Sequence, residues 1–285
     1  MSEEKKKNLV RFGAVIAIAA LIVAVPLFWR ALHQESTDDA FIDAHVVPIS
    51  PQVAGRISRV YVSDNQRVKA GDPLFDIDDR DYAAKLAEQR AKVAKAEAES
   101  ARAAVDARRY AEIYQKDEIS KQQLDQANAD ADTTRAQVAQ EQAAAEKAEL
   151  DLSYTKVRAP ESGRVTRKNV EAGAYVEVGQ VLLAIVPEEV WVTANFKETQ
   201  ITHMRPGQQV QIKVDAYPGK IFHGRVDSIQ AGTGERFSLL PPENATGNYV
   251  KVVQRIPVKI ILDDTSDPQY LLAPGMSVVP TVYVK

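Results

Sequence analysis

Cysteine is absent from the 285-residue chain, and neither sign of charge dominates, since the formal net charge is only −3. The first absence excludes disulfides, thiolate metal sites and thiol-linked lipids. The second gives no support for nucleic acid as a partner. The four histidines (His33, His45, His203 and His223) show no metal-ligand spacing, and no G-x-S-x-G nucleophile elbow is present. The sequence therefore predicts no enzyme, no metal site and no cofactor.

One long uncharged apolar run occupies residues 12–29, after a lysine cluster and Arg11 and before Arg30. As a helix its 18 residues would extend about 27 Å, close to the hydrocarbon thickness of a bilayer. A cleaved signal peptide is the alternative, but its apolar core is usually about 7–15 residues and ends at small side chains. This run ends on bulky residues including Trp29. We expect an uncleaved anchor, a cytoplasmic N-terminus and export of everything after residue 32.

Residues 80–152 are rich in alanine and follow a heptad rhythm, with a break near residues 116–120 and no proline from Tyr82 to Val157. The pattern predicts two antiparallel helices of about 50 Å each. On the first helix the inward positions are Tyr82, Leu86, Gln89, Val93, Ala96, Ser100, Ala103, Ala107, Tyr110 and Tyr114. On the second they are Leu124, Ala127, Ala131, Thr134, Val138, Glu141, Ala145, Ala148 and Leu152. Ser120 is a predicted N-cap, with Gln123 completing a capping box.

The sequences that flank this helical run repeat one another. Gly55-Arg56-Ile57 matches Gly163-Arg164-Val165 at an offset of 108. The same offset pairs a set of aliphatic residues and two further glycines: Val62 with Val170, Val68 with Val176, Gly71 with Gly179, Leu74 with Leu182, and Ile77 with Ile185. We expect the aliphatics on one buried face and the glycines at turns of positive φ.

Each copy is too small to hold a core alone, so the two halves should form one β module. Both ends of the helical run must then meet at this β module. A hairpin inserted into a split domain is therefore favoured over a dimerisation coiled coil.

This split module resembles the biotinyl/lipoyl β-sandwich. The carrier lysine of such domains lies at a hairpin tip, but residues 63–66 and 171–174 contain none, and Lys69 and Lys168 lie off the tip. A covalently loaded carrier is therefore disfavoured. After residue 187, short alternating segments predict a small antiparallel β-barrel. Pro280 in the closing segment suggests an edge strand or a bulge.

Four aspartates gather where the first half of the module meets the first helix: Asp76, Asp78, Asp79 and Asp81. Acidic residues at a helix start suit the helix macrodipole. We prefer this explanation to a cation site.

Three stretches carry a more specific resemblance: residues 37–45, residues 155–165, and the barrel signature at 194–200, 232–248 and 253–258. Together they resemble the HlyD family of membrane fusion proteins (periplasmic adaptors), and within it the EmrA type. The resemblance implies an adaptor of a tripartite efflux system for hydrophobic toxic compounds. It would link an inner-membrane EmrB-like major-facilitator transporter to a TolC-like outer-membrane channel.

The resemblance also implies a homo-oligomeric ring, a hexamer in the assembly, at the inner membrane with the bulk of the chain in the periplasm. Two other functions stay open. One is an adaptor for ABC-driven type I secretion or aromatic-acid efflux, and the other is a lipoyl-type carrier protein.

Adaptors of this family dock on the channel through an Arg/Leu/Ser pattern at the hairpin tip. The resemblance transfers this role to Arg109, Ile113, Ser120 and Asp125, with Ile113 in place of the usual leucine. Arg109 could donate to a partner carboxylate or carbonyl. The competing interpretation is a salt-bridged tip with an ordinary N-cap.

The predicted fold is an elongated α+β multidomain chain: an N-terminal transmembrane helix, a split lipoyl-like β-sandwich with an inserted antiparallel coiled-coil hairpin, and a C-terminal antiparallel β-barrel. The expected parts are a cytoplasmic tail (1–8), an anchor (9–32), a linker and barrel strand (33–45), sandwich half 1 (46–79), the hairpin (80–153, tip near 116–120), sandwich half 2 (154–187) and the barrel with a membrane-proximal strand (188–285).

Overall fold

The computed structural model describes residues 33–234, 252–263 and 270–284. The chain forms two compact units, one of residues 46–187 and one that combines residues 1–45 with 188–285. The predicted anchor and cytoplasmic tail lie outside the described residues, as does most of the signature at 232–248. Within the described ranges, no helix is both long and apolar enough to cross a membrane.

The first unit contains the β-sandwich, made of two four-stranded sheets with the orders β3-β10-β8-β5 and β7-β6-β4-β9. Its strands are β3 (Val47–Ile49), β4 (Gly55–Val60), β5 (Arg67–Val68), β6 (Pro73–Ile77), β7 (Lys156–Arg158), β8 (Gly163–Thr166), β9 (Tyr175–Val176) and β10 (Leu183–Val186). Each sheet takes two strands from each half of the repeat. At the offset of 108, each strand of one sheet corresponds to the strand at the same place in the order of the other sheet. Neither half can therefore complete a sheet alone.

The sandwich core consists of the paired aliphatics that the repeat predicts. Val62, Val170, Val68, Val176, Leu74, Leu182, Ile77 and Ile185 are all buried. Each repeat half thus contributes the same positions to one apolar interior, which is the arrangement that the matched spacing requires.

The glycines of the repeat serve two different purposes. Gly71 and Gly179 have φ of +88° and +80°, as predicted for turns. The same expectation is wrong for Gly55 and Gly163, which lie in strands without positive φ. A Cβ on Gly163 would lie 2.4 Å from the Val186 carbonyl oxygen, and one on Gly55 would lie 2.6 Å from Ile77 Cγ2. These two glycines permit close approach of neighbouring chain.

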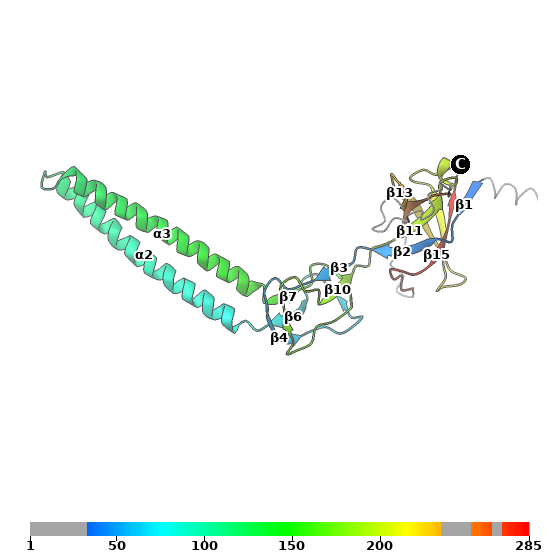
Figure 1. Ribbon diagram of the computed structural model, residues 1–285, viewed down its shortest axis with the longest axis horizontal. Helices are drawn as coiled ribbons and strands as arrows, with labels where there is room; N and C mark the ends of the chain where they lie inside the picture. The colour runs from blue at the N-terminus through cyan, green and yellow to red at the C-terminus, as the bar shows by residue number, and fades with distance from the viewer. Residues whose placement is uncertain (1–32, 235–251, 264–269, 285) are drawn as a thin grey trace, which may run out of the picture. The chain divides into compact units, whose positions relative to one another are not determined.

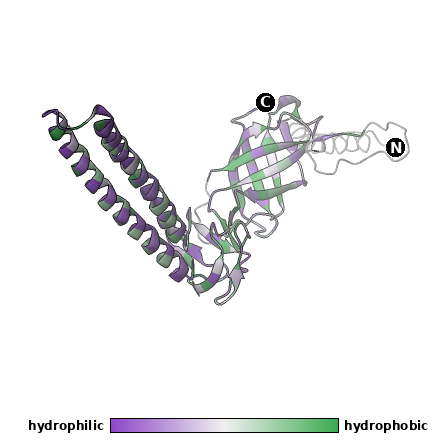
Figure 2. Ribbon diagram, turned by 60° about the vertical axis from the view of Figure 1, so that its left-hand side comes forward, coloured by the Kyte–Doolittle hydropathy of each residue, from purple (hydrophilic) through white to green (hydrophobic). Residues whose placement is uncertain are grey.

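Two antiparallel helices, α2 (Arg80–Tyr114) and α3 (Lys121–Ser153), are inserted between β6 and β7 and lie side by side (Figure 1). Their buried residues all fall at predicted inward positions: Leu86, Ala96, Ala107, Ala131 and Ala148. The other predicted positions are partly buried except Tyr114, which is 37% exposed. The predicted hairpin is confirmed. Four of its five buried residues are alanines, and hydrophilic colour covers much of both helices (Figure 2).

The second unit is a seven-stranded antiparallel sheet in the order β1-β15-β12-β13-β14-β11-β2. Its strands are β1 (Gln34–Ser36), β2 (Ala40–Ala44), β11 (Val190–Lys197), β12 (Gln209–Val214), β13 (Ile221–Ile229), β14 (Arg255–Leu262) and β15 (Val278–Tyr283). A bridge between Phe41 and Ser277 brings β2 against the start of β15 and helps to close the barrel. Alternate residues of β11 are buried, which explains the apolar and polar alternation of its sequence.

The prediction that Pro280 marks an edge strand or a bulge is wrong. Strand β15 lies between β1 and β12, and its pairing with β12 continues without a register shift. The carbonyl of Pro280 accepts a 3.4 Å hydrogen bond from the Thr37 amide, beyond the last residue of β1. The Pro280 nitrogen, which carries no hydrogen, therefore faces the side on which β1 has already ended. No hydrogen bond between strands is lost there.

Candidate functional site: the root and the tip of the hairpin

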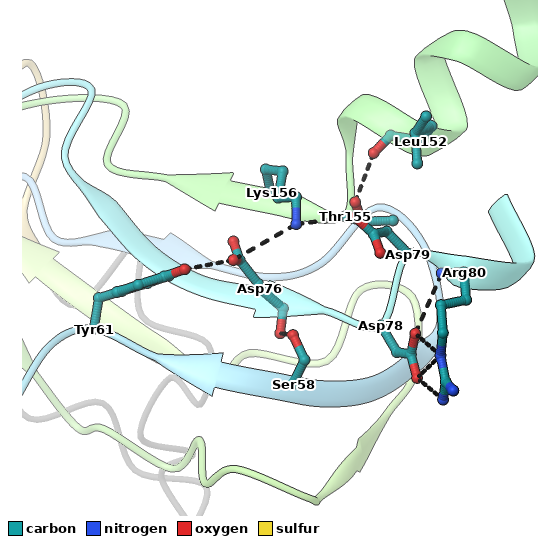
Figure 3. Close-up of polar contacts among 9 residues, drawn as sticks. All are labelled: Ser58, Tyr61, Asp76, Asp78, Asp79, Arg80, Leu152, Thr155 and Lys156. Carbon is teal, nitrogen blue, oxygen red and sulfur yellow. Dashed lines mark hydrogen bonds and ion pairs between the residues drawn. The ribbon is translucent and has the colours of Figure 1, made fainter. Parts of the chain in front are cut away.

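The root of the hairpin is the place where α2 leaves β6 and α3 enters β7 (Figure 3). The Asp76 carboxylate accepts a 2.6 Å hydrogen bond from the Tyr61 hydroxyl and lies 3.6 Å from Lys156 Nζ. The same ammonium pairs with Asp79 at 3.0 Å. These hydrogen-bonded partners raise the pKa of Lys156, most strongly Asp79. Lys156, on the strand after the hairpin, is thereby tied to two residues before it.

A second ion pair lies at the start of α2. The Arg80 guanidinium donates to both carboxylate oxygens of Asp78, with Nη2 2.6 Å from Oδ2 and Nε 2.9 Å from Oδ1 (Figure 3). The side-chain hydrogen bonds from Arg80, followed by the bond from its backbone amide, lower the pKa of Asp78 to about 2. The carboxylate therefore stays ionised and paired over the physiological range.

Of the four aspartates at the root, three have basic partners: Arg80 for Asp78, and Lys156 for Asp76 and Asp79. Asp79 occupies the N-cap position of α2 but makes no side-chain capping bond, and only Asp81 lies in the first turn. The described part of the chain holds no group of three ligands suited to a metal ion. Ion pairing explains this cluster better than the helix macrodipole does.

Buried contacts complete the attachment of the hairpin to the sandwich. The Tyr82 hydroxyl donates to the Ala54 carbonyl at 2.7 Å, and its ring packs on the sandwich core. Thr155 is fully buried, with its hydroxyl 2.6 Å from the Leu152 carbonyl, and its own carbonyl accepts a 2.8 Å bond from the Ile77 amide. Both helices are thus anchored at the root.

The tip is a compact turn between α2 and α3. The Ile113 carbonyl accepts hydrogen bonds from the amides of Lys116 at 3.0 Å and Glu118 at 3.4 Å. Asp117 has a positive φ of 58°, which reverses the chain. Ser120 then caps α3: its hydroxyl accepts from the Gln123 amide, while the Gln123 side chain accepts from the Ser120 amide. The predicted capping box is confirmed.

All four predicted docking residues lie at this end of the hairpin. Arg109 and Ile113 occupy the last two turns of α2, while Ser120 and Asp125 belong to the start of α3. Arg109 is exposed and pairs with Asp106 at 3.2 Å, and Ile113 is half-buried. The Asp125 side chain is exposed and makes no hydrogen bond or ion pair with a described residue. The local contacts fit a salt-bridged, capped tip, and they leave Arg109, Ser120 and Asp125 accessible to a partner.

Sequence reasoning did not identify Tyr61 and Lys156 as root residues. Asp76 lies in β6 and Asp79 at the N-cap of α2, so the whole hairpin separates both from Lys156 in the sequence. No local pattern signals such a contact. Tyr82 did carry a signal, since it begins the inward column of α2. The pattern identified it as a helix-seam residue, whereas it also packs on the sandwich.

Two family models match the chain. The barrel-sandwich hybrid domain of RND membrane fusion proteins matches residues 45–188, and the CusB-like β-barrel domain matches residues 189–236. The first match covers the sandwich and the hairpin. The first description names membrane fusion proteins. Both models carry the name RND, a pump class other than the one that the EmrA resemblance implies.

Among relatives, the multidrug export protein EmrA of Haemophilus influenzae is 32% identical over 99% of this chain and 84% of its own length. EmrA of Escherichia coli K12 is 34% identical over 91% of this chain and 80% of its own. The membrane fusion protein Spr0693 of Streptococcus pneumoniae R6 is a structural neighbour with a TM-score of 0.66 at 19% identity, covering 88% of this chain and 99% of the neighbour. This last likeness concerns the fold alone.

Four findings agree: the sandwich with its inserted hairpin, the barrel, the family match over half the chain, and the 32% identity with an EmrA over 99% of this chain. The chain belongs to the membrane fusion protein (periplasmic adaptor) family, and within that family it is of the EmrA type.

Proposed function

We propose that this protein is the periplasmic adaptor of a tripartite multidrug efflux system. Residues 9–32 would anchor it in the inner membrane beside an EmrB-type major-facilitator pump, and the hairpin tip would dock on a TolC-like outer-membrane channel. The observation that carries the proposal is a hairpin fixed at its root and accessible at its tip, in a chain 32% identical to a multidrug export protein.

The geometry suits a connector. Each arm has 33 to 35 residues and therefore extends about 50 Å. Small residues in the seam let the two helices approach closely, while the root contacts restrain their base against the sandwich. A force or displacement at the base is then passed to the tip, where Arg109, Ile113, Ser120 and Asp125 would contact the channel. Such a role requires no chemistry from the adaptor itself.

In the assembly, several copies would surround a continuous route, and we propose a ring of six. A cyclic ring uses heterologous contacts between neighbours, so every copy can present its hairpin toward the same channel. The transported compounds would be hydrophobic or amphiphilic. The names of further relatives, a fatty acid resistance protein of Neisseria gonorrhoeae and a colistin resistance protein of Acinetobacter baumannii, support this class. They also favour drug efflux over type I protein secretion or aromatic-acid efflux.

A deletion strain that lacks redundant pumps tests the proposal. We expect it to become several-fold more susceptible to lipophilic drugs and uncouplers, and we expect the wild-type gene to restore resistance. Unchanged susceptibility would contradict the efflux function.

Charge reversal at the tip tests docking separately. Arg109→Glu should abolish resistance without lowering the protein level, because a partner carboxylate or carbonyl would be repelled. Arg108→Glu is the matched control, since Arg108 is also exposed and lies one position away on another face of α2. If both variants confer full resistance, Arg109 has no docking role.

A further inference from the structure

One end of the barrel unit has a hollow of about 960 Å³. Its polar lining consists of His33, Gln34, His203, Arg205, Gln208 and Tyr283, among others. His33 and His203 are 170 positions apart in the sequence, where nothing relates them. The barrel brings them into one cavity.

Two ordered segments form this hollow. On one side β1 pairs with β15, with Gln34 opposite Tyr283, and the Val284 amide donates to the His33 carbonyl at 3.0 Å. On the other side the short 3-10 helix η1 (Ile201–His203) leads to a turn at Arg205. The Gln208 side chain holds this turn, since it donates to the His203 carbonyl at 2.9 Å and accepts from the Arg205 amide at 2.9 Å.

Three side chains of the hollow, those of Arg205, His203 and Tyr283, hold hydrogen-bond donors that have no acceptor among the described residues. Arg205 is exposed and uses only Nη1, toward the carbonyls of Thr202 at 3.0 Å and Met204 at 2.7 Å. Its Nε and Nη2, the His203 imidazole and the Tyr283 hydroxyl donate to no described residue. None of the residues that line the hollow carries a carboxylate. The nearby Glu35 instead accepts a bond from Gln200.

The position of the hollow along the chain suggests its ligand. His33 follows Trp29, the last residue of the apolar run, by four positions. Four residues reach at most about 14 Å. If that run spans the inner membrane, His33 lies within this distance of the bilayer surface, where phospholipid headgroups are found.

We infer that this hollow binds the phosphate of an acidic phospholipid in the leaflet from which the barrel unit emerges. The inference rests on the membrane anchor of the proposed function. A phosphodiester presents acceptor oxygens to the planar Arg205 guanidinium, which suits such groups. His203 and Tyr283 supply two further donors. A zwitterionic lipid fits less well, because its cationic headgroup would meet the guanidinium.

Native mass spectrometry of the full-length protein tests this. The protein is released from neutral-detergent micelles that contain phosphatidylglycerol or phosphatidylcholine with identical acyl chains. We expect retention of one phosphatidylglycerol per protomer in preference to phosphatidylcholine. Arg205→Gln should lower this retention about tenfold, as expected for the loss of a charge-assisted hydrogen bond.

Lys213→Gln is the matched control, because it removes one exposed positive charge from the other end of β12. Tyr283→Phe is a second test with little risk to folding, and it should lower retention less than Arg205→Gln does. Equal retention of the two lipids by the wild type would overturn the inference, and a protein segment would then be the expected occupant of the hollow. Wild-type retention by Arg205→Gln would also overturn it.

Extraction of cell membranes with alkaline carbonate separates this failure from failure of the anchor. If the full-length protein is released with peripheral proteins, the anchor and the inference are both wrong. If it stays in the membrane but shows no lipid preference, only the lipid site is wrong and the efflux proposal stands.

Discussion

The two ends of the hairpin differ in where their polar groups find partners. At the root, Asp76 binds both Tyr61 and Lys156, Lys156 also binds Asp79 from the other side of the hairpin, and Thr155 is buried. At the tip, the Arg109 side chain pairs with Asp106, one helical turn away, and Ser120 bonds to Gln123 and Leu124; these are their partners among the described residues outside the regular helix bonds. The root is therefore stabilised by long-range contacts, whereas the tip is held by local ones and remains accessible.

This difference separates structural from functional polar residues. Exposed groups with only local partners cost little to rearrange when another protein binds. Groups that connect distant strands cannot be moved without loosening the fold. Changes at the root should therefore affect stability, and changes at the tip should affect efflux.

The largest expected effect lies in the sandwich that carries the root. Gly163→Ala would place Cβ 2.4 Å from the Val186 carbonyl oxygen, a backbone atom that cannot move aside. We expect a loss of about 3 kcal/mol in the free energy of unfolding, measured by thermal denaturation. Gly55→Ala is the paired control at the same repeat position. It meets the Cγ2 methyl group of Ile77 and no backbone atom, so we expect a smaller loss of about 2 kcal/mol. Equal effects would show that the two halves are packed alike.

The next effect compares tyrosines at the two ends. Tyr82→Ala removes a ring packed on the sandwich core and the hydrogen bond to Ala54, so we expect a loss of about 2 kcal/mol. Tyr114→Ala, at the tip end of α2, should cost about 0.5 kcal/mol because its side chain is 37% exposed. Hydrogen exchange of sandwich amides measures both. A similar loss of protection in the two variants would remove the distinction between root and tip.

Ser120 allows capping and docking to be separated at one position. Ser120→Ala should destabilise the start of α3 by about 1 kcal/mol, whereas Ser120→Asp should keep the cap. Hydrogen exchange at the first turn of α3 measures this. If the tip docks, both variants should lower resistance, because Asp adds a charge at the contact. Full resistance with Ser120→Asp would mean that Ser120 is only a cap.

The smallest effect concerns the Asp78–Arg80 pair. The pKa of Asp78 falls from the usual 3.8 to about 2 in the folded protein. A carboxylate with a lowered folded-state pKa stabilises the fold above its unfolded-state value, and this stabilisation is lost as the pH falls from about 4 to 2. Asp78→Asn should lower the melting temperature slightly at pH 6 and have no effect near pH 2. Arg80→Gln should reproduce this pattern, and a difference that persists at pH 2 would rule out the ion pair as its cause.

The sequence predicted most where a contact repeats at a fixed period. The heptad columns identified the buried alanines of α2 and α3, and the offset of 108 identified the aliphatic core of the sandwich. The sequence predicted less where a residue is needed because of a neighbour that is distant in the chain. Gly163 and Gly179 are both matched glycines of the repeat, yet Gly163 permits close approach of neighbouring chain and Gly179 permits a turn. Pro280 is tolerated inside the sheet only because β1 is short.

Contacts between residues distant in the chain were the hardest to predict. Tyr61 meets Asp76 across a strand pair, Lys156 reaches Asp79 from beyond the hairpin, and His33 lines one hollow with His203. None of these pairs has a spacing that marks it. The four tip residues were found through the family resemblance, and their docking role stays a prediction.

The most direct test of the central claim is site-specific photo-cross-linking in living cells. A photoreactive residue replaces either Lys116 at the tip or Lys85 near the root, two lysines that are both exposed on the hairpin. We predict an adduct with the outer-membrane channel from position 116 and none from position 85. Absence of the adduct at position 116, or equal adducts from both positions, would contradict a hairpin that is fixed at its root and docks by its tip.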